Sequence, residues 1–585
     1  TLDVYGDITM NSLDDIALGT TDTGAYTEVH LTGTIHGSID IADQADFYIK
    51  NGGTIEFSSI SMGTVYAGYL YLDEGTLSPG GEDNIITANV YAILTTDSSS
   101  SQKNEGIYLF DLEMGENVGD GTSDVINVST SESSSAPHGT VDVNLTGDNL
   151  LASGESDSVA IFTTSQSISF STANLSVEDS STVDYELSVG NDGSHENITL
   201  TYTVDYAPAS ANLSTNQRSV GKYISQLAKA TRGANANDDS PAFVKSLAHH
   251  LLAVQTHDEL KQIYDLLGPG EIFATAQTTV LSSLRFDNKL HSVPKVGDNG
   301  IAIFWDEGSG VWADVYGAFS NRGDEPESAG YSENTYGVAA GMQYRFGSDW
   351  VVGGAFSYER SYLWANNYSG NCHRLQAGIV GKKIIGATTI SGTFSGGFGA
   401  YEATRTLFNP TGSSPSQADS SPNNGWIAAH ARIEHRFTPL KWLQVQPSLD
   451  VGVCQFWQGA YSESGSNPFA LEIDSYSKTN VTMNPMVEVM TNFNLGGIEL
   501  ATSVRAGVLG FLTDRDISTN ARLQGTGTAG PWFTLSDTDD RIYGQVGAEI
   551  SGRITDHITV QVGFDSLLGG NSSEYVGTAK LNFTF

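Results

Sequence analysis

The side chains of this chain that could take part in chemistry are charged residues spaced two apart in otherwise apolar segments. Arg432, Glu434 and Arg436 occupy successive positions of one phase. The other phase of that segment is apolar, with Ile427, Ala429, Ala431, Ile433 and Phe437. Successive side chains of a strand point to opposite faces. One face would therefore be apolar, and the other would carry charges that can pair with one another or line a channel.

Charged residues stand on the corresponding face of several other segments. The candidate set is Arg374, Arg432, Glu434, Arg436, Asp450, Glu499 and Arg505. Apolar residues outside and charged residues inside are expected of a closed barrel in lipid, where an open sheet edge cannot be hydrated. A soluble sandwich would also alternate, but it would not usually bury charges at successive positions of one face. Two roles remain open for this set: partners of a buried helix, or the lining of a conducting channel.

The sequence offers little support for catalysis or metal binding. No Ser/His/Asp set lies in a nucleophile elbow, and the adjacent His249 and His250 would point to different faces of a helix. Cys372 and Cys454 lie on lumen-facing positions of non-neighbouring strands, so a disulfide could form only across the lumen, and two residues alone make no metal site. We therefore expect no catalytic residue, no cofactor and no metal. Arg322-Gly323-Asp324 is more simply an ordinary loop than an integrin-binding tripeptide.

Twelve segments repeat the two-residue alternation and predict an antiparallel transmembrane β-barrel. The even number is the one that bacterial outer-membrane barrels require. The segments run roughly from 310–320, 336–346, 350–362, 372–382, 387–402, 426–437, 441–456, 480–493, 497–511, 541–553 and 557–566 to 574–585.

The connections between these segments alternate in length. Long ones follow odd-numbered segments, at Asn321–Thr335, Thr404–Gly425, Ala460–Thr479 and Thr513–Asp540. Tight ones follow even-numbered segments, as at 347–349, 494–496 and 555–556. Because long loops of such barrels face outwards and short turns face the periplasm, both ends of the barrel sequence are expected on the periplasmic side.

Composition narrows the class of protein. The chain has 585 residues, with 68 acidic against 28 basic residues and a net charge of −40, which argues against nucleic acid or another polyanion as a partner. Its 64 glycines and 16 % charged residues are typical of an all-β surface protein. No apolar run reaches the ~18–20 residues of a membrane helix. Because the chain begins within a strand-like pattern and shows no signal peptide, we expect a mature or truncated fragment.

The first 98 residues contain a loose repeat. Gly33-Thr34-Ile35, Gly53-Thr54-Ile55 and Gly75-Thr76-Leu77 recur at spacings of 20 and 22. Short strands at this period predict the coils of a right-handed parallel β-helix, although an ordinary sandwich with a chance repeat remains an alternative. Strand patterns continue to residue 206 in a less regular form, where a capping segment is expected.

A helical region follows from Ala207. Capping boxes at Ser214–Gln217 and Thr256–Glu259 predict two helix starts. The segment Glu271–Ser292 has no Pro or Gly and is rich in small residues. Its 22 residues would span about 33 Å as a helix, close to the ~30 Å of a bilayer core. We expect this helix inside the barrel, with Ala274, Thr278, Ser282 and Arg285 among its lumen contacts; the alternative is an amphipathic helix packed on the cap.

Several motifs, taken in this order, resemble those of the monomeric autotransporters of Gram-negative bacteria. They are Gly75–Gly80 at the close of the β-helix, 123–128 with 139–141 in an autochaperone region, Leu213–Gln217 before the translocator, Val445-Gln446-Pro447 in a barrel strand, and Phe583-Thr584-Phe585 at the end. The Asn-Asn cleavage site of serine-protease autotransporters is absent from the predicted pore helix, where Asp287-Asn288 is the nearest match. The likeness covers essentially the whole chain.

The resemblance implies five parts and a function. The parts are a β-helix passenger fragment (1–98), its cap or autochaperone (99–206), a helical linker (207–268), a pore-traversing helix (269–296) and a 12-stranded translocator barrel (297–585). Leu581, Phe583 and Phe585 would form the signal for the barrel-assembly machinery. Outer-membrane lipid, that machinery and periplasmic chaperones are the implied partners. The chain would secrete and anchor its own passenger; alternatively it is mainly a surface adhesin that binds cells or matrix, and an outer-membrane protease is a distant third.

Overall fold

The computed structural model consists of two compact units. They are Thr1–Leu213 with Gly221–Gln262, and Ser214–Val220 with Ile263–Phe585. The structure describes all residues except 1, 11, 13–15, 21–26, 42–44, 51, 63–68, 92, 96–105, 130–136, 165–167, 192–194, 233–238, 292–308, 348, 411–415, 441, 466, 496–497, 528–529 and 556. The predicted boundaries at 98/99 and at 296/297, and most of the predicted linker 233–240, lie outside the described residues. The finer division into five parts stays a prediction.

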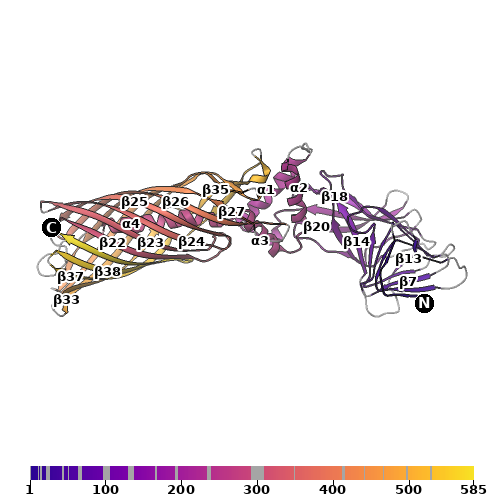
Figure 1. Ribbon diagram of the computed structural model, residues 1–585, viewed down its shortest axis with the longest axis horizontal. Helices are drawn as coiled ribbons and strands as arrows, with labels where there is room; N and C mark the ends of the chain where they lie inside the picture. Colours follow the sequence, from indigo (N-terminus) through magenta and orange to yellow (C-terminus); the bar gives the residue numbers. More distant parts are fainter. Residues whose placement is uncertain are drawn as a thin grey trace. The chain divides into compact units, whose positions relative to one another are not determined.

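The first unit is a parallel β-helix built from three parallel sheets (Figure 1). One sheet holds β1 (Leu2–Val4), β4 (Thr27–Leu31), β7 (Ala45–Lys50), β10 (Tyr69–Asp73) and β13 (Ile93–Thr95). The second holds β2 (Ile8–Thr9), β5 (Thr34–His36), β8 (Thr54–Phe57), β11 (Thr76–Pro79), β14 (Gly106–Glu113), β17 (Gly139–Leu145) and β19 (Leu175–Val177), with β15 (Thr122–Ser123) antiparallel to β14. The third begins with β3 (Ile16–Thr20), β6 (Ser38–Ile41), β9 (Ser59–Met62), β12 (Thr87–Tyr91), β16 (Val125–Val128) and β18 (Ser156–Thr164).

The Gly-Thr repeat marks the same position in successive coils. Thr54 pairs with Thr34 on one side and with Thr76 on the other, as the repeat predicts. The glycines are needed because neighbouring coils approach closely. A Cβ on Gly75 would lie 2.3 Å from Ile49 Cγ2, and one on Gly53 would lie 2.7 Å from Leu31 O.

An antiparallel hairpin ends the β-helix within the predicted cap region. Its strands are β20 (Val183–Asn191) and β21 (Glu196–Val204), and β21 also pairs antiparallel with β18. The start of the predicted cap, through β14, β16 and β17, is still parallel coil. The hairpin therefore gives the last coil a partner that is not another coil.

The helical region follows the predicted boxes. It comprises η1 (Ala209–Ala211), α1 (Thr215–Thr231), α2 (Asp239–Leu252), α3 (His257–Leu267), η2 (Gly270–Phe273) and α4 (Ala274–His291). Before α1, Gln217 N–H donates to Ser214 Oγ at 3.2 Å and Ser214 N–H donates to Gln217 Oε1 at 2.9 Å, which completes a capping box. None of the helices in the described part of the chain has the length and apolar character needed to cross a membrane.

The second unit contains a closed antiparallel barrel of twelve long strands. They are β22 (Gly310–Arg322), β23 (Tyr331–Phe346), β24 (Trp350–Trp364), β25 (Tyr368–Ile385), β26 (Thr388–Leu407), β28 (Asn423–His435), β30 (Leu443–Gln458), β33 (Tyr476–Leu495), β34 (Ile498–Phe511), β37 (Ile542–Thr555), β38 (Ile558–Leu568) and β39 (Ser572–Thr584). The first strand pairs with the last over thirteen residues, which closes the barrel. Two short strands, β27 (Ser416–Ser420) and β29 (Phe437–Leu440), extend the ladder.

The strands run further than predicted at the long-loop end. The first connection spans only 323–330, because β22 continues to Arg322 and β23 begins at Tyr331. The connections 365–367 and 569–571 also follow odd-numbered strands and are only three residues long. At about 3.3 Å per residue, the 20-residue strand β26 is far longer than a membrane requires. The strands therefore extend beyond the membrane on this side.

The two longest connections between the barrel strands form a small sheet that the sequence analysis did not predict. The order of its strands is β31 (Tyr461–Ser462), β32 (Leu471–Ile473), β35 (Ile517–Leu523) and β36 (Phe533–Asp537). The short helix η3 (Gln524–Thr526) lies between β35 and β36. We call these four strands the loop sheet.

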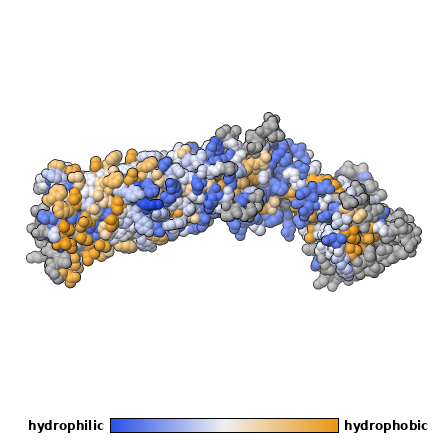
Figure 2. Space-filling view, in the orientation of Figure 1, coloured by the Kyte–Doolittle hydropathy of each residue, from blue (hydrophilic) through white to orange (hydrophobic). Residues whose placement is uncertain are grey.

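Apolar residues cover one half of the barrel's outer surface. Figure 2 shows them gathered toward the end of the barrel that carries the C-terminus, whereas the other half is mostly polar. Exposed aromatic side chains stand beside the short turns, among them Phe346, Trp350, Trp442 and Phe493. An apolar band flanked by aromatic residues is the lipid-facing surface of an outer-membrane barrel, so the short turns lie on the periplasmic side.

Candidate functional site

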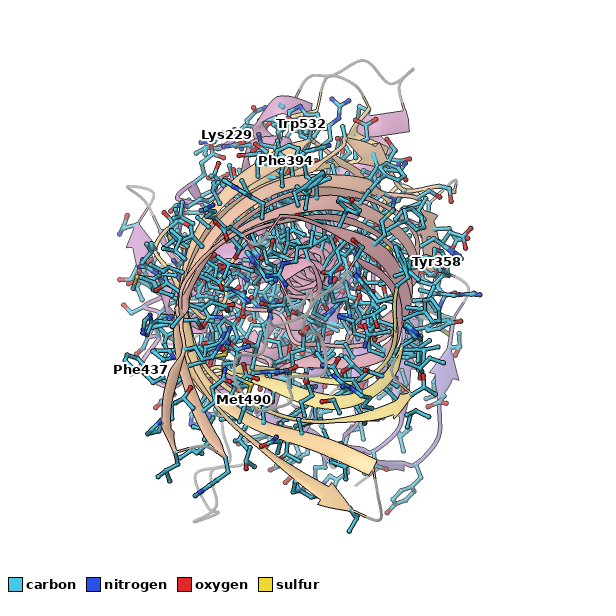
Figure 3. All side chains as sticks on the ribbon, turned by 90° about the vertical axis from the view of Figure 1, so that its left-hand side faces the viewer. Lys229, Tyr358, Phe394, Phe437, Met490 and Trp532 are labelled. Atoms are coloured by element: carbon cyan, nitrogen blue, oxygen red, sulfur yellow. The ribbon has the colours of Figure 1, made fainter. Side chains whose placement is uncertain are left out.

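Helix α4 fills part of the barrel lumen, where the sequence placed it. Figure 3, viewed along the barrel, shows the helix inside the ring of strands. Sixteen of its eighteen residues are buried, including Ala274, Thr278, Ser282 and Arg285. The alternative of an amphipathic helix packed on the cap is therefore excluded.

Small residues let the helix lie close to the barrel wall. Thr278, Thr279 and Ser282 have no exposed surface. Thr279 Oγ1 lies 2.8 Å from the hydroxyl of Tyr401 on β26. The wall makes room as well, since a Cβ on Gly378 of β25 would lie only 2.6 Å from Leu290 Cδ1. A larger residue on either surface would push the helix from the wall.

Buried charges bind the middle of the helix to the wall. Arg285 pairs with Glu574 of β39 at 2.5 Å and approaches Glu359 of β24 at 3.7 Å. Arg374 of β25 donates to the same Glu359 at 2.6 Å, and Ser282 Oγ donates to it at 2.6 Å. All four charged residues are at most 7 % exposed. Removing one partner would leave another charge buried and uncompensated.

A second buried pair fixes the helix one turn further on. Lys289 Nζ lies 2.5 Å from Asp314 Oδ2 of β22 and 3.8 Å from the centre of the Tyr316 ring. The Tyr316 hydroxyl in turn donates to Glu359 at 2.9 Å. The two charge clusters are therefore parts of one network.

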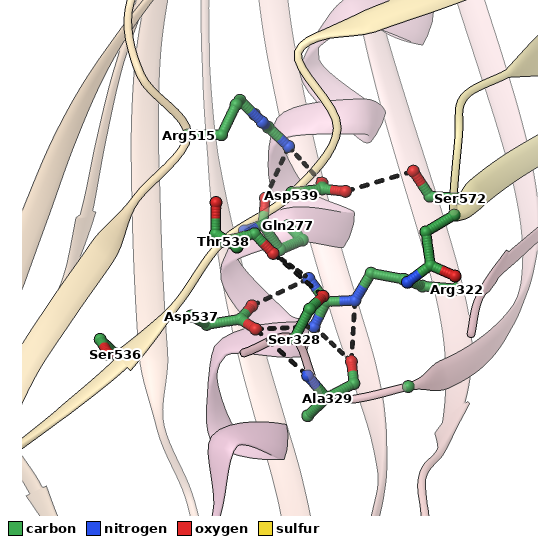
Figure 4. A network of polar contacts seen from close by, with 12 residues as sticks. Gln277, Arg322, Ser328, Ala329, Arg515, Ser536, Asp537, Thr538, Asp539 and Ser572 are labelled. Carbon is green, nitrogen blue, oxygen red and sulfur yellow. Dashed lines mark hydrogen bonds and ion pairs between the residues drawn. The ribbon is translucent and has the colours of Figure 1, made fainter. Parts of the chain in front are cut away.

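At the outer end, a polar network joins the helix to the connection that carries β35 and β36 (Figure 4). Arg515 donates to Gln277 Oε1 of α4 at 2.6 Å and pairs with Asp539. Burial raises the pKa of Asp537 to about 6, although its partner Arg322 opposes the shift. Burial also acts to raise the pKa of Asp539, but Arg515 and Arg322 together hold it below its usual value.

The predicted lumen residues divide between two environments. Arg374 is fully buried against the helix, and Arg432 both donates to Asn288 of α4 at 2.9 Å and pairs with Asp450 at 3.2 Å. Arg505 instead pairs along the wall with Asp565 and Glu549. Arg374 and Arg432 are therefore partners of the helix, whereas Arg505 lines the lumen wall.

Three further residues of the predicted lumen set have no described contact with the helix. Glu434 is half-buried and lines a lumen cavity. Arg436 lies at the break between β28 and β29, where its backbone N–H donates to Ala387 O at 2.9 Å, and it is not among the cavity-lining residues. The side chain of Glu499 lies outside the described residues. The cavity, beside the second half of α4, has a volume of about 180 Å³.

The remaining candidates have local partners. Cys372 and Cys454 are both buried and free, so no disulfide crosses the lumen. His249 Nδ1 lies 3.2 Å from Asn149 Nδ2. Arg322 of the Arg-Gly-Asp tripeptide is only 2 % exposed and is held by Asp537, so it cannot present this tripeptide to a partner.

The wall partners of the helix were missed by sequence reasoning. Glu359, Glu574 and Asp314 each stand on the polar phase of their strand, and this phase was the available signal. A single acidic residue in a polar phase does not reveal which helix residue it will meet.

The last strand presents the predicted terminal residues to lipid. Leu581, Phe583 and Phe585 are 52 %, 45 % and 66 % exposed on the outer surface. Phe585 N–H donates to Ser309 O at 3.1 Å, next to the first strand. The terminal residues therefore stand at the seam where the barrel closes.

Comparison with known families identifies the barrel. Residues 311–565 match the family model described as autotransporter beta-domain. This range begins in β22 and ends in β38, so it covers nearly the whole strand sequence of the barrel. Among curated proteins, none matches this chain.

Several solved barrels are similar at low sequence identity. The translocator domain of autotransporter NalP from Neisseria meningitidis has 14 % identity, with 54 % of this chain and 100 % of that chain covered and a TM-score of 0.42. The beta domain of the Bordetella autotransporter BrkA has 12 % identity, with 48 % of this chain and 100 % of that chain covered and a TM-score of 0.36. The transport unit of the autotransporter AIDA-I from Escherichia coli has 14 % identity, with 47 % of this chain and 90 % of that chain covered and a TM-score of 0.33.

Proposed function

We propose that this chain, an autotransporter whose barrel belongs to the autotransporter beta-domain family, carries its own N-terminal unit across the outer membrane and holds it at the cell surface. The barrel lies in the outer membrane. The N-terminal β-helix is the passenger in this proposal. Transport and anchoring, rather than catalysis, are the proposed activities of the chain.

The path of α4 through the lumen carries the proposal. Its first turn lies near the long-loop end, where Thr275 O accepts a hydrogen bond from the Tyr401 hydroxyl at 3.0 Å. Its last residue lies near the short turns, where His291 O accepts one from Lys382 Nζ at 2.7 Å. The chain that precedes α4 therefore leaves the barrel at the outer end, whereas the barrel strands begin and end at the periplasmic end.

A secretion order follows from this path. The barrel inserts with help from the barrel-assembly machinery and periplasmic chaperones, and the passenger passes outwards through the lumen as a hairpin. The capped end of the β-helix emerges first and folds first. Its hairpin β20–β21 offers a formed edge on which the next coil can pair, so folding outside can draw the rest of the passenger across without nucleotide hydrolysis.

Protease access to whole cells tests the proposal. An epitope tag at residue 2 should be removed by external protease, whereas a tag in the short connection between β37 and β38 should be removed only after the outer membrane is opened. The tagged chains should both reach the outer membrane in equal amounts. A tag at residue 2 that stays protected in intact cells would contradict transport of the passenger.

One feature of the β-helix favours surface adhesion as a second function. Tyr48 and Tyr71 occupy paired positions in successive coils, with ring centres 4.5 Å apart and planes within 7° of parallel. His30 pairs with Tyr48 on the other side at 5.0 Å. A partly exposed aromatic ladder provides flat apolar faces with polar edges, which suit stacking against sugar rings.

Glycan binding by the whole chain tests this second function. Replacing Tyr48 and Tyr71 together with Ala should abolish binding of intact cells to a glycan array. Tyr5→Ala is the matched control, because Tyr5 is 79 % exposed but has no ring partner among the described residues. Equal binding by all three cell types would remove the ladder as a ligand site.

A further inference from the structure

The last turn of α4 brings four buried side chains of metal-binding type together. Asp287 and His291 lie four residues apart, so they share one face of the helix. They meet His430 of β28 and Asp450 of β30, and each of the four residues is at most 6 % exposed. One oxygen or nitrogen atom from each of Asp287, His291 and Asp450 lies within 4.8 Å of the other two.

His291 has a buried nitrogen without a hydrogen-bond partner. Its Nδ1 lies 2.9 Å from Ser391 Oγ, whereas Nε2 has no hydrogen bond and faces the cluster. Nε2 is 3.4 Å from Asp287 Oδ2 and 3.5 Å from Asp450 Oδ2. When Nδ1–H donates to Ser391, the lone pair of Nε2 points at two carboxylate oxygens. This arrangement is repulsive unless a cation lies between the three atoms.

The spacing of these atoms fits a small ion. Zn²⁺ binds imidazole nitrogen and carboxylate oxygen at about 2.0–2.2 Å in tetrahedral geometry, which places neighbouring ligand atoms about 3.3–3.6 Å apart. The two distances from His291 Nε2 to the carboxylate oxygens of Asp287 and Asp450 fall in this range. His430 Nδ1 also lies 2.9 Å from Asp450 Oδ1, so it can orient that carboxylate.

We propose that Asp287, His291 and Asp450 bind one divalent transition-metal ion of the Zn²⁺ class, with His430 holding the Asp450 carboxylate in place. One imidazole and two carboxylates, with a fourth position left open to water, are a donor set that this class of ion accepts. The two carboxylates supply two negative charges for the ion, and Arg432, whose Nε lies 3.2 Å from Asp450 Oδ2, is the nearest competing cation. All four residues line the 180 Å³ lumen cavity, which provides an access route from solvent.

The ion would tie the end of the pore helix to the barrel wall. Asp287 and His291 belong to the helix, whereas His430 and Asp450 belong to neighbouring wall strands. The ligands come together only when the helix is seated, so metal binding would stabilise the plugged state and no other. On the proposed function, the ion would therefore hold the helix in the lumen once the passenger has been transported.

Metal content and stability of the purified full chain in detergent test the proposal. After dialysis against buffered Zn²⁺, the wild-type chain should retain one equivalent of zinc. His291→Ala and Asp450→Asn should each bind zinc at least about tenfold more weakly. The matched control is His557→Ala in an exposed turn, which should retain zinc as the wild type does. Zinc should also raise the temperature at which the wild-type barrel unfolds, and EDTA should reverse this rise.

Two results would overturn the proposal. One is equal zinc retention by the wild type and His291→Ala. The other is an unfolding temperature that does not respond to zinc but rises on acidification alone, which would show that a proton on His291 fills the gap. If the variants do not fold, X-ray absorption of the zinc-treated wild type decides: a first shell of mixed nitrogen and oxygen at about 2.0–2.1 Å supports the site, and the absence of bound zinc rejects it.

Discussion

Arg322 and Asp537 form a buried bidentate ion pair, with Nη1 2.9 Å from Oδ2 and Nη2 3.1 Å from Oδ1. Arg322 is the last residue of β22, and Asp537 is the last residue of β36 in the loop sheet. The same guanidinium donates to Ala329 O. This pair therefore fastens the loop sheet to the first barrel strand.

Arg322→Ala should loosen the loop sheet. The substitution leaves Asp537 buried without its partner, and breaking a buried pair in this way costs roughly 3–5 kcal/mol. We expect faster hydrogen exchange in β35 and β36 with an unchanged barrel. Arg541→Ala, at an exposed position, is the control and should exchange as the wild type does. Unchanged exchange in the Arg322 variant would mean that other contacts hold the sheet.

The stability of the first unit should fall as pH rises. Burial raises the pKa of Asp124 to about 7, and the nearby Asp111 carboxylate adds to the effect. Because this value lies above that of an unfolded Asp, about 3.9, the folded state binds the proton more tightly. The contribution is then complete below about pH 4 and is lost as pH rises through 7.

Pulse proteolysis of the first unit at pH 5 and pH 8 measures this dependence. Asp124→Asn should flatten it, because the group no longer titrates. Both carboxyl oxygens of Asp124 accept a backbone N–H bond, from Ile86 and from Asp111, whereas an Asn amide can accept only one of them, so the variant should also be less stable at pH 5. Asp184→Asn, at an exposed position, should keep the wild-type dependence.

The alternation of side chains was enough to predict the barrel and its twelve strands, because lipid and lumen impose opposite chemistry on the two faces. Strand ends were not predictable in the same way. Above the membrane the outer face meets water, so the outer phase of β26 there is polar, with Glu402, Thr404 and Thr406, while the inner phase stays buried. The loop sheet was missed because β31 and β32 are only two and three residues long, too short to show a side-chain alternation.

The types of residue that fill and line the lumen could be predicted, but not which of them contact one another. Small residues and length placed α4 inside the barrel, and the polar phase indicated which wall residues face it. The contact between Arg285 and Glu574 joins residues 289 positions apart and depends on how the helix is rotated in the lumen. The cluster of Asp287, His291 and Asp450 depends on the same rotation, which the spacing of two residues on one helix does not reveal.

Charges inside the β-helix should unfold the passenger but leave the barrel intact. Val141 and Leu145 are 1 % and 8 % exposed on β17, and Val143 lies between them on the same strand. Replacing all three with Asp would bury charges without partners. We expect an inserted barrel with a passenger that external protease degrades. Ser156→Asp with Ser158→Asp, at exposed positions of β18, is the control, and wild-type resistance of the triple variant would contradict a folding role for this region.

The final residue should be needed for barrel assembly. Deleting Phe585 or replacing it with Asp removes an exposed apolar side chain at the seam between β39 and β22. We expect little heat-modifiable protein in the outer membrane. Phe437→Asp introduces the same charge at an exposed position away from the terminus. Equal losses in both variants would indicate a general effect of charge in the lipid-facing surface rather than a terminal signal.

Removal of the plug should open the lumen. A chain that begins at Gly268 keeps α4, whereas a chain that begins at Gly297 lacks it, and both keep all twelve strands. Without the helix, the carboxylates of Glu359, Glu574 and Asp314 lose cationic or hydroxyl partners that are now at most 3.7 Å away. The shorter chain should therefore show larger single-channel conductance in planar bilayers and unfold at a lower temperature.

The substitution Arg285→Ala distinguishes the effect of filling the lumen with the helix from the effect of pairing the buried charges. It leaves the helix in the lumen but removes the cation that Glu574 and Glu359 share, so stability should fall while conductance stays closer to that of the longer chain. If the chains with and without the helix conducted equally and unfolded at the same temperature, α4 would not plug the barrel. The outward path of the passenger inferred from the helix would then have to be abandoned, because it rests on this one segment crossing the lumen.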